Sequence, residues 1–143
     1  MNKEKIALLL VRLSIGFIFL WAFFDKLLGL GFATIAEKAW IHGGSPTFGF
    51  LTYAVKGPFA SFYQSIAGNP IIDWLFMTGL LFVGVTLLLN KYVKWGAIAG
   101  IAMLFLMYTA VLLPENNPII DDHIVYILIL SYFALKADRE EIK

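Results

Sequence analysis

Apolar residues are gathered in four long runs along the chain, and polar residues interrupt them only rarely. The runs cover residues 6–30, 71–89, 93–113 and 119–135. Each run is close to the ~20 mostly apolar residues that a helix needs to cross the hydrocarbon core of a bilayer. The pattern therefore predicts an all-α fold, a polytopic membrane bundle of four spanning helices, in a single domain that covers residues 1–143.

The segment between the first two runs, residues 31–70, has aromatic residues at helical spacing, and no apolar stretch within it is long enough for a further span. One apolar face consists of Phe32, Ile35, Ala36, Ala39 and Trp40, and a second of Phe59, Phe62, Tyr63 and Ile66. The stretches Gly43-Gly44-Ser45-Pro46 and Gly57-Pro58 break the pattern. We expect short amphipathic helices here that lie in the membrane interface or cap the bundle.

The pentapeptide Asn-Pro-Ile-Ile-Asp occurs twice, at residues 69–73 and 117–121. Asn is a favoured N-cap, Pro fits the first helical turn, and Asp there interacts favourably with the helix dipole. The repeat therefore predicts the start of the second and of the fourth span. The chain would then consist of two helix pairs in the same orientation, with Gly16 and Gly100 at comparable depth in the first helix of each pair.

Composition agrees with a membrane protein, because 60% of the residues are hydrophobic and only 15% are charged. A soluble domain has roughly 45–50% apolar and about 25% charged residues. The chain has no cysteine, which excludes disulfides, thiolate-held iron–sulfur clusters and c-type haem attachment. Lys3 and Lys5 precede the first run as they would in a signal peptide, but no small-residue cleavage site follows. We therefore expect a retained first helix.

Basic residues are unevenly divided between the two sides of the predicted bundle. One side would carry Lys3, Lys5, Arg12, Lys91, Lys94, Lys136, Arg139 and Lys143, and the other Lys26, Lys38 and Lys56. Because basic residues concentrate on the cytoplasmic side of membrane proteins, we predict a multi-pass protein of the cell membrane with both termini in the cytoplasm. Residues 31–70 and both pentapeptides would then lie outside.

Two cations in the first span lie on one stripe with Gly16, Phe19 and Phe23. Arg12 and Lys26 stand at the two ends of this stripe, whose spacing places all five residues on one helix face. We expect the stripe to face the bundle and Arg12 to have an internal partner. Candidate partners at similar depth are Thr86, Asn90, Ser131 and Tyr132. In the alternative interpretation, Arg12 and Lys26 extend to opposite interfaces and do not pair.

Ionisable and aromatic residues also gather at the outer ends of three spans. They are Trp21, Asp25, Lys26, Asp73, Trp74, Asp121, Asp122, His123 and Tyr126. One interpretation is a set of solvated helix ends with an interfacial belt of aromatic residues. The other is a site for a polar headgroup or a proton relay, since ionisable residues in spans are costly and often functional.

The second interpretation places a polar headgroup or proton-relay site at the outer ends of the first and fourth spans. Histidine titrates nearest neutrality, at a pKa of about 6.5. Asp122 and His123 are therefore the candidate catalytic residues. The candidate binding residues are Trp21, Asp25, Lys26 and Tyr126, whereas Arg12, Asp73 and Asp121 are assigned structural polar roles.

Other chemistry finds little support in the sequence. His42 and His123 are poorly placed to hold a haem together, and the adjacent residues Asp121, Asp122 and His123 diverge on a helix, so neither haem nor a metal is predicted. Gly96 and Gly100 are spaced for close helix packing. No P-loop, dinucleotide fingerprint, nucleophile elbow or zinc-protease motif is present, and nothing indicates nucleic-acid binding.

The first span, RLSIGFIFLWAFFDKLLG, resembles the first helix of the DoxX-like membrane proteins. Arg12, Gly16, Phe19, Lys26 and Leu27 match that pattern. The stretches GSPTFGFL, KGPFASFYQSIAGNP and NPIIDDHIVY are similar to the DoxD branch, which includes the membrane subunit of thiosulfate:quinone oxidoreductase. The resemblance covers essentially the whole chain, and the order of these motifs is more specific than any one of them.

The resemblance implies a quinone-linked oxidoreductase subunit. It would pass electrons from a small sulfur compound such as thiosulfate to a membrane quinone, the quinone being a substrate. The quinone headgroup would then bind near the outer end of the bundle, between the first and fourth spans. Its binding residues would be Trp21, Asp25, Lys26 and Tyr126, and Asp122 and His123 would transfer the protons. It also implies a second, mostly extracytoplasmic subunit, and a homo-oligomer embedded in membrane lipid is possible. A non-catalytic scaffold or assembly factor that docks an extracytoplasmic partner is the alternative, and a small transporter is a more distant one.

Overall fold

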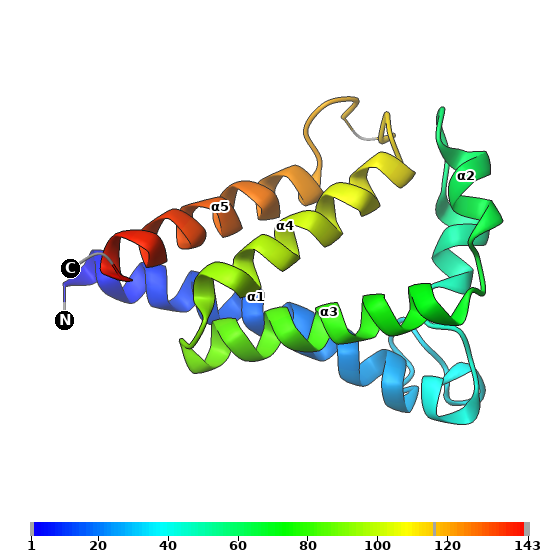
Figure 1. Ribbon diagram of the computed structural model, residues 1–143, viewed down its shortest axis with the longest axis horizontal. Coiled ribbons are helices and arrows are strands. Elements are labelled where there is room, and N and C mark those ends of the chain that lie inside the picture. Colours follow the sequence, from blue (N-terminus) through cyan, green and yellow to red (C-terminus); the bar gives the residue numbers. More distant parts are fainter. Residues whose placement is uncertain (1, 116, 142–143) are drawn as a thin grey trace.

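The computed structural model describes residues 2–115 and 117–141, and helices make up most of this part (Figure 1). The four long helices are α1 (Lys3–Leu28), α3 (Pro70–Leu89), α4 (Val93–Ala110) and α5 (Asp122–Glu141). The segment between α1 and α3 contains the 3₁₀ turns η1 (Ala36–Lys38) and η2 (Trp40–His42), the π-helical turn η3 (Phe50–Ala54) and the short helix α2 (Ala60–Ser65).

Three helices, α1, α3 and α4, are long and apolar enough to cross a membrane, as their runs predict. Within the described residues, α5 does not reach that standard. The predicted fourth run began at Ile119, but α5 begins only at Asp122. The all-α fold and three candidate spans are therefore confirmed, whereas a bundle of four spans stays a prediction.

The four long helices run alternately back and forth along the long axis of the molecule (Figure 1). In chain order, α1 packs on α3, α3 on α4, and α4 on α5. The start of α1, the turn between α3 and α4, and the end of α5 lie toward one end. Residues 29–69 and the loop between α4 and α5 lie toward the other end, which is called the capped end below. Both pentapeptides are at this capped end.

The core lies where the long helices cross, and glycines bring the helices close together there. Its buried apolar residues are Ile15, Phe19, Met77, Leu80, Val83, Leu87, Ala97, Leu104 and Leu130. A Cβ on Gly16 would lie 3.0 Å from the Leu87 Cβ of α3, and one on Gly100 would lie 2.7 Å from Leu130 of α5. Larger residues would push these helices apart, so the two glycines have corresponding roles in the two predicted helix pairs.

Helices α3 and α4 approach closely near their connecting turn and diverge toward the capped end (Figure 1). A Cβ on Gly96 would overlap the Thr86 side chain, and one on Gly79 would overlap the sulfur of Met103. The Gly96 to Gly100 spacing is therefore a packing feature, as predicted. Beyond Gly79 the segment between α1 and α3 covers the space between the two helices.

The segment 32–40 does not form the continuous amphipathic helix that its spacing predicts. Ile35 and Ala39 are in extended conformation and interrupt it, which leaves η1 and η2 as separate turns. Ala39 is fully buried, whereas Phe32 is 74% exposed. The Asp25 carboxylate binds the backbone N–H groups of Phe32 and Ala33 and holds the chain away from a helical path. The second predicted short helix is confirmed as α2.

Candidate functional site

Arg12 of α1 faces the neighbouring helix α3. Its guanidinium donates a hydrogen bond to the backbone carbonyl of Leu87, in the last turn of α3. The last four carbonyls of a helix have no partner within the helix, and a cation is favourable at that end. Arg12 therefore has the internal partner that the stripe predicts, although this partner is a carbonyl and none of the four candidate side chains.

Asp25 and Lys26 are neighbours in α1 with different surroundings. The Asp25 carboxylate is 2% exposed and accepts hydrogen bonds from the N–H groups of Phe32 at 3.2 Å and Ala33 at 2.9 Å. The half-buried Lys26 makes no hydrogen bond or salt bridge with any other residue in 2–115 and 117–141. Asp25 thus organises the turn after α1, and the Lys26 ammonium is left available for a ligand.

Asp73 holds the segment between α1 and α3 against the start of α3. One of its carboxylate oxygens accepts hydrogen bonds from the hydroxyls of Ser45 at 2.9 Å and Thr47 at 2.6 Å, and from the Thr47 N–H at 3.2 Å. Asp73 and Thr47 are both 5% exposed. A buried carboxylate with several donors is a strong tether, because hydrogen bonds to charged groups are stronger than neutral ones.

Asp121 and His123 pair with each other at the start of α5. The Asp121 carboxylate accepts hydrogen bonds from the N–H groups of His123 and Ile124, and its second oxygen is 2.7 Å from His123 Nδ1. Burial raises the pKa of Asp121, but the hydrogen bonds from His123 and Ile124 outweigh this and lower the pKa below its usual value. Asp122 is exposed. Asp121 therefore caps α5, and it engages the imidazole that was assigned to proton transfer.

The predicted aromatic residues have partners of their own. Trp21 packs against Phe17 and edge-on against Phe32, with ring centroids 5.8 and 5.1 Å apart. Trp74 meets Trp40 edge-on at 4.6 Å. Tyr126 is partly buried against the helix core.

The three predicted carboxylates Asp25, Asp73 and Asp121 bind separate segments of the chain, and none binds another of the three within the described residues.

A cavity of about 770 Å³ lies at the capped end, between α3 and α4 and beneath the segment that joins α1 to α3. Its walls come from α1 (Lys26), the connecting segment (Ala33, Thr34, Ile35, Lys38, Ser45, Pro46, Thr47, Gly49, Phe50, Leu51, Phe62, Tyr63, Ile66), α3 (Ile72, Leu75, Phe76) and α4 (Met103, Leu106, Met107, Ala110). Of the six residues assigned to catalysis or quinone binding, Lys26 alone lines this cavity in the part that the structure describes.

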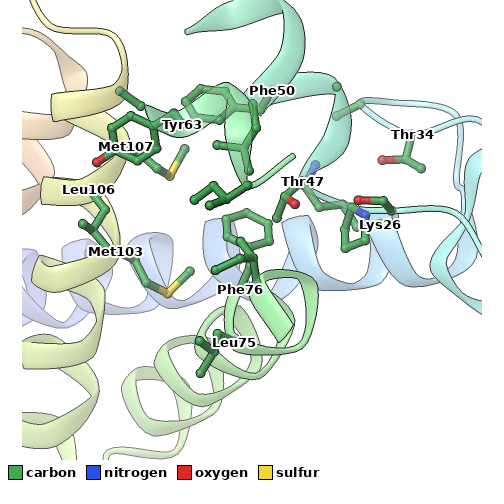
Figure 2. Close-up of a pocket in the computed structure, with 18 of the residues that line it drawn as sticks. Lys26, Thr34, Thr47, Phe50, Tyr63, Leu75, Phe76, Met103, Leu106 and Met107 are labelled. Carbon is green, nitrogen blue, oxygen red and sulfur yellow. The ribbon is translucent and has the colours of Figure 1, made fainter. Parts of the chain in front are cut away.

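Polar and apolar groups are segregated within the cavity. Figure 2 shows Lys26, Thr34 and Thr47 at one side, and Met103, Leu106 and Met107 of α4 at the other. Phe50 and Phe76 project into the space between them. Lys38 also lines the cavity, and no carboxylate of the described residues does. The arrangement suits an amphipathic molecule with an apolar body and an acceptor-rich or anionic head.

Sequence reasoning did not find this cavity, because 13 of its 21 lining residues belong to the segment between α1 and α3. The aromatic content of that segment was a usable signal, but the side to which each aromatic residue turns depends on Asp25 and Asp73.

No group of three or more His, Asp or Glu side chains able to hold a metal occurs among residues 2–115 and 117–141.

Comparison with known proteins adds no identification. The chain matches no protein-family model, no curated protein and no solved structure.

Proposed function

We propose that this protein is the membrane subunit of a quinone-linked oxidoreductase and that the cavity binds the quinone. The observation that supports this best is the half-buried Lys26 ammonium at the polar side of a large, otherwise mainly apolar cavity. The resemblance of the first span to DoxX-like proteins, which includes Lys26, agrees with it. The quinone would then lie between α3 and α4, whereas the expectation from the sequence was a site between the first and fourth spans.

The physical fit of a quinone is straightforward. Pockets for small molecules have volumes of about 300–1,000 Å³ and combine apolar walls with a few placed polar groups. A quinone ring is flat and apolar, with carbonyl oxygens that only accept hydrogen bonds. The Lys26 ammonium makes no hydrogen bond or salt bridge within residues 2–115 and 117–141, so its donors can reach the quinone, and Phe50 and Phe76 supply apolar surface. As the ring gains electrons its oxygens gain negative charge, which a fixed cation stabilises.

Electrons would come from the second, mostly extracytoplasmic subunit. There two thiosulfate anions each lose one electron and couple through a new sulfur–sulfur bond. The quinone takes up the two electrons and two protons and becomes the quinol. Asp122 and His123 remain the proposed path for the protons, although neither lines the cavity. This chain would bind the acceptor and hold it near the partner.

The proposal includes four membrane crossings, with α5 as the fourth. In its support, α5 packs along α4, and the start of α1 and the end of α5 lie at the same end of the molecule (Figure 1). The uneven distribution of basic residues would then place both termini in the cytoplasm. A cysteine at position 45 should react with an impermeant thiol reagent in intact cells, and one at position 92 should not. The reverse labelling would overturn this topology.

Ligand binding to the purified protein tests the proposed function directly. A benzoquinone with a decyl tail should bind in detergent and quench tryptophan fluorescence. Lys26→Met should weaken binding about tenfold, because a charged hydrogen bond contributes roughly 1.5–3 kcal/mol. Lys91→Met is the matched control, since Lys91 is exposed at the far end of α3 and does not line the cavity. Absence of binding to the wild-type protein would refute the proposal.

The scaffold function is the second candidate, and one observation favours it. Phe32, Tyr53 and Phe62, at the capped end, are 74%, 81% and 61% exposed. Such rings could contact lipid or a partner subunit. If a second subunit co-purifies with the native protein while no quinone binds, the scaffold function replaces the catalytic one.

A further inference from the structure

We propose that the ligand enters the cavity from the bilayer through the gap between α3 and α4, with its apolar tail left in that gap. The inference rests on the proposed function, because it concerns the same cavity. It adds the class of ligand, which is a membrane-dissolved molecule with a long apolar tail, and it assigns Leu75 and Leu106 as the residues that contact the tail.

Toward α1 and α3 the cavity wall consists of hydrogen-bonded chain. Asp25 of α1 holds Phe32 and Ala33, and Asp73 of α3 holds Ser45 and Thr47. Both carboxylates are buried. A ligand entering through this side would have to break hydrogen bonds to a buried charge, each of which contributes more than a neutral one.

The segment that covers the cavity is fastened to the end of α4 as well. The Lys56 N–H donates to the Ala110 carbonyl at 2.9 Å, and the Tyr63 hydroxyl is 2.6 Å from the Thr109 hydroxyl. The Lys56 ammonium also forms a salt bridge with Glu115 at 3.0 Å. The segment that covers the cavity is thus hydrogen-bonded to α1, α3 and α4, and moving it away would break several of these interactions at once.

The side between α3 and α4 is different, because apolar side chains alone form it. Leu75 of α3 and Leu106 of α4 both line the cavity and are 64% and 56% exposed. Figure 2 shows them on the two neighbouring helices, with Met103 between. No side-chain hydrogen bond joins α3 to α4 along this stretch in the described part of the chain. Methionine is flexible and adapts to neighbours of different shape.

The gap between α3 and α4 ends at Gly79, where α3 contacts Met103 of α4. Leu75 lies one turn beyond Gly79 toward the capped end, where the two helices diverge (Figure 1). Because α3 and α4 are candidate spans, the gap would open into hydrocarbon. An apolar tail that remains there keeps its favourable surroundings, while the polar head reaches Lys26.

The test compares two probes on variants of the purified protein. The probes are a benzoquinone with a decyl tail and the same ring with a methyl group in its place. Leu75→Trp and Leu106→Trp narrow the gap, and Leu81→Trp on α3 and Phe105→Trp on α4 are controls at exposed positions outside the cavity. Binding of the decyl probe should weaken about tenfold in the gap variants, as expected for loss of about two buried methylene groups. Binding of the methyl probe should be unchanged, and the controls should bind both probes normally.

Each alternative outcome has a distinct meaning. Equal weakening of both probes, or no weakening of either, overturns entry through this gap and leaves quinone binding intact. Failure of the wild-type protein to bind either probe refutes the proposed function itself. Should a tryptophan variant fail to fold, Leu75→Ala provides the same comparison, because loss of tail contact should weaken the decyl probe alone.

Discussion

The same five residues occur where helices α3 and α5 start, yet the two copies fold differently. In the first copy Asn69 is the N-cap, its side chain accepts the Ile71 N–H at 2.9 Å, and α3 begins at Pro70. In the second copy Asn117 makes the same kind of bond to Ile119, but a non-helical turn follows. Helix α5 begins only after the pentapeptide ends.

The two aspartates explain the difference. Asp73 is bound by Ser45 and Thr47, so it acts as an anchor inside a helix that has already begun. Within residues 2–115 and 117–141, Asp121 makes no hydrogen bond to another segment, and it accepts the N–H groups of His123 and Ile124, which makes it the cap of α5. A local motif thus supplies several possible hydrogen bonds, and tertiary contacts select among them.

The opposite end of α3 is also bound by another segment, because Arg12 of α1 donates a hydrogen bond to the Leu87 carbonyl. Helix α3 is therefore bound near both ends by side chains from other segments of the chain, whereas α5 is capped by Asp121, the residue just before it. Substitutions should distinguish the two arrangements, and those at α3 should have the larger effects.

The largest effect is expected from Asp73→Ala. The change leaves the buried Thr47 donors without their acceptor, and unpaired buried groups cost about 1–3 kcal/mol each. We expect a loss of about 3 kcal/mol in the free energy of unfolding, measured in mixed detergent micelles, together with weaker quinone binding, because Ser45 and Thr47 line the cavity. Asp73→Asn keeps an acceptor oxygen and should lose less. A loss no larger than that of Asp121→Ala would contradict the anchoring role.

For Arg12→Leu we expect a smaller loss in the free energy of unfolding, about 2 kcal/mol. The substitution removes a charged donor from the end of α3 and leaves the Leu87 carbonyl without it. Arg12→Lys, which retains a cation at this depth, should recover part of the loss. Thermal unfolding of the three proteins in the same detergent provides the measurement. Equal stability of wild type and Arg12→Leu would show that the guanidinium contributes nothing to packing.

Much of the fold follows from the sequence because it depends on local pattern. The apolar runs predict α3 and the start of α4 almost to the residue, and the stripe on α1 correctly turns Arg12, Gly16 and Phe19 toward α3. Cap residues and helical spacing are properties of neighbouring positions, so a single sequence contains them. The same reasoning placed the start of α5 too early, since it assigned one structure to both pentapeptides.

The cavity could not be predicted in the same way, because its walls come from positions far apart in the chain. Lys26, Thr47 and Met107 meet only after the segment between α1 and α3 folds back over the helices. That path depends on which donors Asp25 and Asp73 bind, and spacing within the sequence does not specify partners at such separations. Lys26 was singled out for its charge within a span, and it is the residue that the predicted and the observed sites share.

The smallest change in the free energy of unfolding is expected for substitutions of Asp121, and it depends on pH. Its pKa in the folded protein is lowered from 3.8, because hydrogen bonds from His123 and Ile124 outweigh the raising effect of burial. A carboxylate whose pKa is lower when folded stabilises the protein fully above its unfolded pKa, and this stability is lost as the pH falls through the folded pKa.

Asp121→Ala should therefore cost about 1 kcal/mol near neutral pH, as for other lost N-caps. Asp121→Asn is the sharper comparison, because Asn also caps a helix but does not titrate. The difference in unfolding free energy between wild type and Asp121→Asn should shrink as the pH falls below about 4. Denaturant titrations at a series of pH values measure it. A difference that stays constant throughout would mean that the Asp121 charge has no stabilising role, so that its capping of α5, like that of Asn69 on α3, depends only on an acceptor oxygen.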